Sequence, residues 1–460
     1  MGGVAALVAA QLKDVIKPSA RLVVGLSGGV DSVVLLDCLK HASRALRFRL
    51  AALHVNHQLN PNAARWSAFC RRLCRARGIP FESVTVTVRR GDGPEAAARA
   101  ARYDVFTRQD CDFIALAHHR DDQVETVLIQ LLRGAGVKGL AAMPFLRREE
   151  GRGPRIEGAS PDTRHRTLDT RHSTPGILRP LLDATREEIL EYAKQQELKW
   201  IEDESNADVQ FGRNYLRHEV LPAIARRFPS YRAAIARSAR HLAEAADILD
   251  AAAAADGAGH LRNGTLAVEG LRRLPAARAR NLLRWFLAGH GVAMPATERL
   301  DEALRQMIGA KQDARVAIGL KGAKLQRYKD CIHVVRAQKL PRPRSRRWRG
   351  EKCLELPEFD GTLSLKRSAG RGISLARLEG RAVTVRLRSG GERLQPDCRR
   401  PRRSLKNLLQ ELGMPPWRRE RLPLIYCGER LVWAAGIGVD CAFQAQSAEP
   451  ALFPEWLPSG

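Results

Sequence analysis

The 460-residue chain lacks several patterns that mark common protein classes. No apolar run approaches the roughly 20 residues that a membrane-spanning helix needs. None of its nine cysteines forms a Cys-x-x-Cys pair, which argues against a zinc ribbon, an iron–sulfur site and a disulfide framework. We therefore expect a reduced protein of the cytoplasm. Residues 1–10 have no basic start, so we predict a first helix there and no signal peptide.

Acidic residues are scarce relative to basic ones. The chain holds 77 Lys and Arg against 50 Asp and Glu, which gives a net charge of +27. Folding seldom needs such an excess, so it indicates a polyanionic partner, with nucleic acid first in line. An Arg-rich proteome would explain part of the charge, but less easily its clustering. At this length we expect two to four domains, each with its own core.

Residues 21–40 combine an apolar strand pattern, a glycine turn and an apolar helix pattern. Glycines let the backbone approach a ligand, and the N–H groups of the new helix face an anion. Asp31 would repel a phosphate unless it holds Mg²⁺. The turn has neither the Walker A lysine nor the G-x-G-x-x-G spacing, which disfavours kinase, GTPase and dinucleotide chemistry. The alternative is an ordinary turn before a core helix. The predicted phosphate-binding residues are Ser27, Gly28, Gly29, Val30, Asp31 and Ser32.

Strand and helix patterns alternate through the first half of the chain. Further strands are predicted at 49–55, 81–88 and 113–117, with helices at 66–77 and 95–110 between them. This alternation predicts an α/β fold with a doubly wound parallel sheet. Ligands should bind at the carboxyl ends of the strands, where the glycine turn meets the residues that follow the second and fourth strands.

A second polar cluster, HHRDDQVET at 118–126, follows the fourth predicted strand. His118, Asp121, Asp122 and Glu125 fall within about two helical turns, so several can share one face. The plainer alternative is a helix start whose acidic residues favour the helix dipole. We interpret it as a cluster that faces nucleotide and magnesium, with His118 available for phosphate or proton contacts. Other candidates for substrate contacts are Arg99, Arg102, Arg133, Asp203, Ser205, Asn206, Arg213, Asn214 and Arg217.

Composition shifts divide the rest of the chain. Residues 1–222 form the predicted catalytic domain, within which the polar segment 147–176 reads as a disordered insertion. Residues 223–340 are mainly helical, and their arginines either grip an RNA backbone or form a solvated face. A basic linker with short strands spans 341–380, and a small α+β domain spans 381–460. In that last domain, Lys406 and Trp417 are candidates for phosphates and an exposed base.

Seven sequence blocks occur in order and together resemble tRNA(Ile)-lysidine synthetase, a family of the PP-loop (N-type ATP pyrophosphatase) group. The resemblance covers residues 18–222, and the C-terminal block extends it. SGGVDS alone would indicate only the broad group, whereas the later blocks are far more specific. The blocks are SGGVDS at 27–32, HVNHQL at 54–59, AARAARYDVF at 97–106, HHRDDQVET at 118–126, LLRGAGVKGLAAM at 131–143, RPLL at 179–182 and EDESNADVQFGRN at 202–214.

The resemblance implies ATP-dependent joining of free lysine to C2 of the wobble cytidine in an isoleucine tRNA with a CAU anticodon. The reaction passes through an adenylated cytidine and releases AMP and pyrophosphate. It further implies RNA binding by the middle domain and a C-terminal domain that holds the tRNA acceptor region.

The glycine turn would then hold the pyrophosphate portion of ATP. Asp31, helped by Asp121 or Asp122, would hold Mg²⁺. His54 and Asn56 would edge adenine or ribose. Arg213 and Arg217 would contact the activated base or its phosphate, and His118 is our candidate to accept the proton of the lysine amine.

Two other functions stay open from the sequence: a tRNA-thiolating enzyme of the same group, and a non-catalytic RNA-binding protein. We expect no membrane association and leave room for a homodimer.

Overall fold

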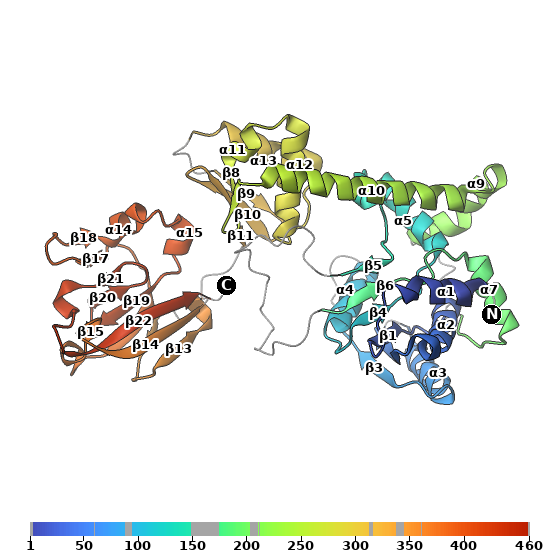
Figure 1. Ribbon diagram of the computed structural model, residues 1–460, viewed down its shortest axis with the longest axis horizontal. Helices are drawn as coiled ribbons and strands as arrows, with labels where there is room; N and C mark the ends of the chain where they lie inside the picture. The colour runs from blue at the N-terminus through green and yellow to red at the C-terminus, as the bar shows by residue number, and fades with distance from the viewer. Residues whose placement is uncertain are drawn as a thin grey trace. The chain divides into compact units, whose positions relative to one another are not determined.

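The computed structural model describes residues 3–58, 60–87, 94–148, 174–202, 210, 212–311, 316–336, 345–359 and 361–458. These residues form two compact units, which divide between residues 255 and 256 (Figure 1). The division falls inside the long helix α10 (Tyr231–Gly257), whereas the sequence placed a domain boundary after residue 222. Most of the predicted insertion at 147–176 lies outside the described residues. Its first and last residues, Arg147 and Gly176, belong to strands β5 and β6.

The first unit contains a six-stranded sheet of order β3-β2-β1-β4-β6-β5 (Figure 1). All neighbouring strands pair in parallel except β5 with β6. The predicted doubly wound parallel sheet is therefore confirmed. The strands are β1 (Arg21–Gly25), β2 (Arg49–Asn56), β3 (Phe81–Thr85), β4 (Phe113–Ala115), β5 (Leu146–Arg147) and β6 (Gly176–Leu178).

Strand order reverses at β1, which pairs with β2 on one side and with β4 on the other. Helix α2 (Val30–Leu46) follows β1, and helix α5 (Arg120–Leu132) follows β4. The two connections leave the carboxyl ends of adjacent parallel strands in opposite directions, which opens a crevice for a ligand. The glycine turn and the 118–126 cluster lie at this point.

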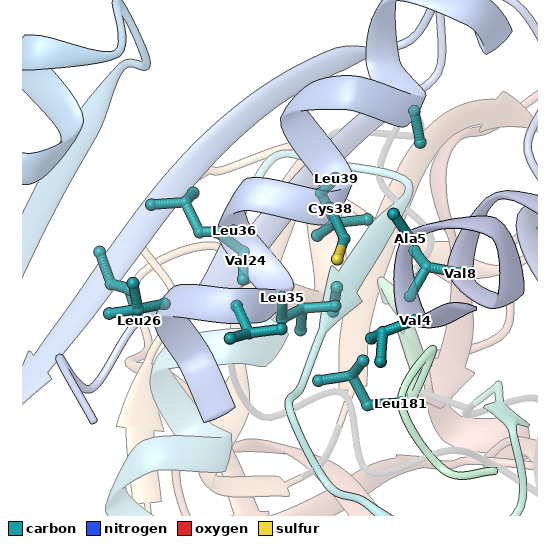
Figure 2. Close-up of a cluster of buried hydrophobic side chains, with 14 of the residues drawn as sticks. Val4, Ala5, Val8, Val24, Leu26, Leu35, Leu36, Cys38, Leu39 and Leu181 are labelled. Atoms are coloured by element: carbon teal, nitrogen blue, oxygen red, sulfur yellow. The ribbon is translucent and has the colours of Figure 1, made fainter. Parts of the chain in front are cut away.

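Alternate residues of the central strands pack on opposite faces of the sheet. Leu22 and Val24 of β1 belong to one core cluster, whereas Val23 packs with another that contains Phe106 and Ile114. Figure 2 shows the first cluster, in which Val4 and Val8 lie near Leu35 and Leu39. Because both faces are covered, the strands read as nearly continuous apolar runs.

The helices of the first unit agree with the sequence predictions to within a few residues at their ends. The first helix expected near the start of the chain is α1 (Gly3–Lys13), and the predicted ranges 66–77 and 95–110 become α3 (Ala63–Ala76) and α4 (Pro94–Thr107). Helix α7 spans Arg186–Gln195. The remaining elements are α6 (Val137–Leu140), α8 (Gly212–Tyr215), a π-helical turn (Leu216–Val220) and α9 (Leu221–Arg227).

The second unit begins with helices and an antiparallel sheet. Helices α11 (Val268–Arg272), α12 (Ala276–Gly289) and α13 (Thr297–Gly309) accompany a sheet of order β7-β8-β11-β10-β9. These strands are β7 (Leu261–Arg262), β8 (Thr265–Ala267), β9 (Ala317–Leu320), β10 (Ala323–Tyr328) and β11 (Cys331–Arg336). No helix in the described ranges is long and apolar enough to cross a membrane.

Residues 345–458, here called the C-terminal module, contain two main antiparallel sheets and a buried core of their own. Strands β19 and β20 pair with each other as an antiparallel hairpin. The sheets have the orders β12-β16-β19-β20-β21 and β13-β14-β22-β15. The elements are β12 (Ser345–Arg347), β13 (Cys353–Leu356), β14 (Gly361–Ala369), β15 (Ile373–Ser374), β16 (Val383–Leu387), β17 (Arg393–Leu394), β18 (Arg403–Ser404), α14 (Leu405–Glu411), α15 (Pro416–Arg419), β19 (Pro423–Cys427), β20 (Arg430–Ala434), β21 (Gly438–Val439) and β22 (Pro450–Pro458).

The expectation of a reduced protein is wrong for one pair of cysteines. Cys398 and Cys441 form a disulfide, with their Cα atoms 5.5 Å apart. Sequence spacing gave no sign of it, because 43 residues separate the two and the fold alone brings them together. Cys70 and Cys74 are fully buried on α3.

Candidate active site

The glycine turn between β1 and α2 is organised around its two serines. Ser32 Oγ accepts a hydrogen bond from the Gly28 amide (3.1 Å) and donates one to the Gly29 carbonyl (2.9 Å). Ser27 Oγ lies 3.1 Å from Ser32 Oγ. No side chain caps the start of α2 at Gly29. The first amides of the helix therefore have no side-chain acceptor, which suits them to bind an anion.

Gly28 cannot be replaced without strain. Its φ of +96° lies in a region that residues with a side chain rarely adopt. A Cβ at this position would also lie 2.8 Å from Ile201 Cδ1 and 3.2 Å from Cys70 Sγ. The turn is thus pressed against the segment that carries Ile201, whose amide donates to the Gly28 carbonyl at 2.9 Å.

Asp31 lies in the first turn of α2 and has an unpartnered oxygen. Its Oδ1 is buried without a hydrogen-bond partner, and its Oδ2 lies 3.9 Å from His119 Nε2. Burial raises the pKa of Asp31 above its ordinary value, although the positive charges of His119 and Arg186 oppose this shift. A buried carboxylate oxygen with no donor nearby costs free energy unless a cation or ligand satisfies it.

His119, and not its neighbour His118, lies at the centre of the acidic cluster. The His119 ring is 1% exposed and stands 3.5 Å from Asp122 and 3.6 Å from Asp121. Burial alone would lower the pKa of His119, but Asp121, Asp122 and Asp31 outweigh it and raise the pKa. His118 is partly buried, its Nδ1 has no partner, and burial lowers its pKa to about 3. His118 is therefore neutral near pH 7.

The two adjacent aspartates make different contacts. Asp121 accepts hydrogen bonds from the Arg186 amide (3.1 Å) and from the Arg232 guanidinium, so it ties α7 and α10 to α5. Asp122 Oδ2 accepts from the His119 amide at 3.0 Å. Burial would raise the pKa of both carboxyl groups, but these cations and hydrogen bonds lower it.

Arg213 and Arg217 both reach this cluster. Their guanidinium groups lie 3.8 Å and 3.7 Å from Asp122 Oδ1. Glu125, which is fully buried, accepts a hydrogen bond from Arg217 Nε at 2.7 Å and lies 3.6 Å from Arg213 Nε. Arg217 belongs to the π-helical turn, a feature often found at functional sites. The structure thus brings together residues that are about 90 positions apart in the sequence.

Glu125 and His119 were given no separate role by the sequence analysis. Glu125 lies one helical turn after Asp122, and that spacing was a usable signal. Nothing in the sequence separates His119 from His118. A third residue, Arg179, is buried and donates to the Pro144 carbonyl at 2.7 Å, while its Nε has no partner. Burial lowers the pKa of Arg179.

The residues predicted to edge adenine or ribose lie at the end of β2. His54 is buried, and its Nδ1 is 2.8 Å from the carbonyl oxygen of Leu26, the residue just before the glycine turn. Asn56 is partly exposed, and its Oδ1 accepts a hydrogen bond from the Gln58 amide at 2.9 Å. Their contact with the nucleotide stays a prediction.

The remaining RNA candidates lie on several elements. Arg99 and Arg102 are exposed on α4, where Arg99 lies over the Tyr103 ring at 5.2 Å. Arg133 is exposed at the end of α5, and Asn214 is partly exposed in α8.

In the C-terminal module, Lys406 is exposed on α14. Trp417 is half-buried in α15, with its ring centroid 5.0 Å from that of His333. The candidates Asp203, Ser205 and Asn206 lie outside the described residues.

The donor set fits Mg²⁺ rather than a protein-enclosed metal. Among the described residues, no group of three or more His, Cys, Asp and Glu side chains is arranged to hold a metal ion. Mg²⁺ at nucleotide sites is commonly held by one or two carboxylates, with phosphates and water completing the shell. Asp31, with its unpartnered Oδ1, and Asp122 match that requirement.

A doubly wound sheet with this glycine turn and an acidic cluster at its switch point defines the PP-loop class of nucleotide-binding proteins. Residues 4–224 match the PP-loop domain family. Residues 266–333 match the TilS substrate binding domain, and residues 383–456 match the TilS substrate C-terminal domain.

Curated relatives match almost the whole chain. The tRNA(Ile)-lysidine synthase of Nitrosomonas europaea is 43% identical over 97% of this chain and 94% of its own. That of Coxiella burnetii is 37% identical over 94% and 92%. The protein belongs to the tRNA(Ile)-lysidine synthase family. Among solved structures, the U34-tRNA thiolase NcsA from Methanococcus maripaludis is 22% identical, with a TM-score of 0.42 over 52% of this chain and 78% of its own.

Proposed function

We propose that this protein joins free lysine to C2 of the wobble cytidine of a CAU-anticodon isoleucine tRNA, using ATP and forming AMP and pyrophosphate. Similarity along nearly the full chain to relatives with that name supports the proposal. One observation carries it at the site. The unpartnered carboxylate oxygen of Asp31 lies at an uncapped helix start, beside the cluster of His119 and Asp122.

The chemistry needs a better leaving group at cytidine C2, because the carbonyl oxygen leaves poorly. Transfer of AMP to that oxygen forms a phosphorus–oxygen bond and releases pyrophosphate. The lysine amine then attacks C2 and displaces AMP. The amides of the glycine turn and the hydroxyls of Ser27 and Ser32 would bind the pyrophosphate portion. Asp31 and Asp122 would hold Mg²⁺, which neutralises charge on the phosphates when bound.

Arg213 and Arg217 supply fixed positive charge for an anionic substrate. Glu125 orients both guanidinium groups before any ligand arrives, so less side-chain freedom is lost on binding. We assign them to the activated cytidine or its phosphate. Neutral His118 can accept the amine proton at Nδ1, although a pKa of about 3 makes it a weak base.

The proposal extends to partners and location. tRNA and free lysine are the substrates, and the net charge of +27 supports RNA binding by steering the polyanion. We also propose a cytoplasmic location, where both substrates and ATP are found. A homodimer is the last part of the proposal; Leu131, Leu132 and Phe228 are exposed apolar side chains of the first unit.

The test incubates the full chain with ATP labelled at the α-phosphate, Mg²⁺, lysine and a CAU-anticodon tRNA transcript. We expect labelled AMP and unlabelled pyrophosphate, in multiple turnovers that depend on both lysine and tRNA, and a lysine adduct on the RNA. Turnover that needs sulfide in place of lysine would assign a thiolation reaction. Release of ADP and orthophosphate, or tRNA binding without turnover, would overturn the proposal. A methionine tRNA transcript with the same anticodon is the specificity control.

A further inference from the structure

The disulfide between Cys398 and Cys441 fastens a loop of the C-terminal module to which the proposed reaction assigns no role. This loop, residues 395–402, joins β17 to β18 and is here called the arginine loop. It contains Arg399, Arg400 and Arg402. Cys441 begins a short 3₁₀ turn that lies 43 residues further along the chain. The bond thus ties the arginine loop to a separate part of the module.

Hydrogen bonds hold the two ends of the arginine loop independently of the disulfide. Asp440, which is fully buried, accepts from the Gln395 amide at 3.0 Å and from the Arg402 guanidinium at 2.8 Å. The Cys441 amide donates to the Gln395 carbonyl at 2.7 Å. These contacts keep the two thiols of the reduced protein at a high effective concentration. The disulfide can therefore open and close again without unfolding of the module.

The tip of the arginine loop depends on the disulfide more than its ends do. Residues 397–401 form neither helix nor strand. The amides of Arg399 and Arg400 both bind within the tip, to the side chain of Asp397 at 2.9 Å and to its carbonyl at 3.1 Å. Both arginines are exposed. Because the covalent tie from this tip to the rest of the module is the disulfide, oxidation orders the two arginines and reduction loosens them.

The pair is accessible to small reagents, unlike most other cysteines of the chain. Cys398 is exposed and Cys441 is half-buried. Elsewhere burial raises the pKa of four thiols to about 11 or 12, so they form little of the thiolate that attacks disulfides. These four are Cys38, Cys70, Cys74 and Cys111. Thiol–disulfide exchange is thereby directed to Cys398.

The proposed location and the local charge indicate the co-reactant. Thiols such as glutathione keep most cysteines of the cytoplasm reduced, and the disulfides that form there are usually transient and redox-sensing. Arg399 and Arg400 directly follow Cys398 and attract anions. Glutathione disulfide is a small anionic disulfide, so it matches both the compartment and the charge.

We propose that Cys398 and Cys441 are a reversible redox pair that exchanges with an anionic small disulfide, and that oxidation fixes the arginine loop for contact with the RNA backbone. The inference rests on the proposed function, because it takes the protein to act on RNA in the cytoplasm.

The exchange proceeds in two steps. The Cys398 thiolate attacks a sulfur of the small disulfide, which forms a mixed disulfide and releases one thiolate. The Cys441 thiolate then attacks Cys398 Sγ and displaces the second. The pair loses two electrons and two protons, and the small disulfide takes them up as two thiols.

The first test equilibrates the full-length protein in mixtures of reduced and oxidised glutathione, blocks free thiols with iodoacetamide and identifies the Cys398–Cys441 disulfide by peptide mass. We expect the disulfide to be lost in excess reduced glutathione and to return as oxidised glutathione is added. A disulfide that survives a large excess of reduced glutathione would be purely structural and would overturn the inference. A pair that never closes would also overturn it.

The second test compares tRNA affinity of the oxidised and the reduced wild type, so it needs no variant that folds. We expect reduction to weaken binding about fivefold, because two arginine side chains must then be ordered on binding. Cys398→Ser should bind like the reduced wild type under both conditions. Cys353→Ser is the matched control, since Cys353 is an exposed free thiol in β13, and it should keep the full response.

Replacing both Arg399 and Arg400 with alanine should abolish the difference between the two redox states. Equal tRNA affinity of the oxidised and reduced wild type would refute the inference. Lysine-dependent pyrophosphate release at saturating tRNA, measured on the same samples, separates the two proposals. If release is absent but the redox-dependent change in affinity persists, the proposed reaction fails and the redox pair stands. Normal release with equal affinities leaves the reaction standing and removes the redox pair.

Discussion

Replacing Asp31 with asparagine tests the site most directly, because it changes charge and keeps shape. Asp31 Oδ1 has no hydrogen-bond partner, and Oδ2 has only the distant His119 ring at 3.9 Å. The carboxylate therefore contributes little to the fold through contacts. Its proposed role is to hold Mg²⁺ against the phosphates, where loss of one stabilising group at a transition state costs about 100- to 1,000-fold in rate, or about 2.7–4 kcal/mol.

The same substitution should leave the fold as stable as before or more stable. Burial raises the pKa of Asp31, so the folded protein prefers the protonated side chain. The stability from this preference is present at low pH and is lost as pH rises through the folded pKa. At neutral pH the ionised side chain opposes folding, and an asparagine cannot ionise. Asp31→Asn should therefore show an unchanged or higher Tm.

The assay measures pyrophosphate release with saturating ATP, lysine and tRNA, together with Tm and tRNA affinity. Asp37→Asn is the matched control on the same helix. Asp37 accepts a hydrogen bond from the Tyr192 hydroxyl at 2.9 Å and lies 3.5 Å from Arg77 Nε. We expect it to lower Tm and keep turnover at a permissive temperature. A lower Tm or weaker tRNA binding for Asp31→Asn, with turnover intact, would refute the reasoning.

Three further predictions concern neighbouring residues. Gly28→Ala should lower the free energy of unfolding by about 1–2 kcal/mol and slow turnover, because a φ of +96° disfavours any side chain. The control Gly29→Ala, at a φ of −71°, should keep the wild-type Tm in thermal melts. Burial and the positive charge of Arg102 lower the pKa of His57 from 6.5 to about 4, so the stability of the folded protein falls as pH drops between these two values. The Tm of His57→Gln should therefore fall less than that of the wild type between about pH 7 and about pH 5. Glu125→Ala should destabilise the protein to urea by about 1–3 kcal/mol, since it removes the carboxylate that Arg217 Nε binds at 2.7 Å and leaves that nitrogen without its partner; an unchanged midpoint would contradict this.

The sheet and its switch point could be predicted because local patterns determine them. Short apolar runs followed by helical periodicity recur along residues 21–117, and only a parallel sheet satisfies such an alternation. The disulfide and the arrangement of the C-terminal sheets could not be predicted in this way. Strand β22 pairs with β14, about 90 residues earlier, and no local pattern encodes that pairing.

The candidate site was predictable where its residues are contiguous. The glycine turn and the 118–126 cluster follow neighbouring strands, so topology alone brings them together. Arg213 and Arg217 follow a polar segment with no clear periodicity, and their positions depend on the π-helical turn and on Glu125. The choice between His118 and His119 depends on which ring points inward, a difference of one residue that composition cannot resolve.

The distribution of unpaired polar atoms separates a binding site from a structural ion-pair network. A network that serves only stability satisfies its members, because each buried polar atom without a partner costs about 1–3 kcal/mol. Here Asp31 Oδ1 and His118 Nδ1 are buried without hydrogen bonds within one cluster. Nearby, Asp121 is fully engaged by Arg186 and Arg232. Asp121 thus fixes the helices, whereas other polar atoms of the cluster lack hydrogen-bond partners. This pattern is expected where a nucleotide, a cation and an amine bind and supply the missing partners.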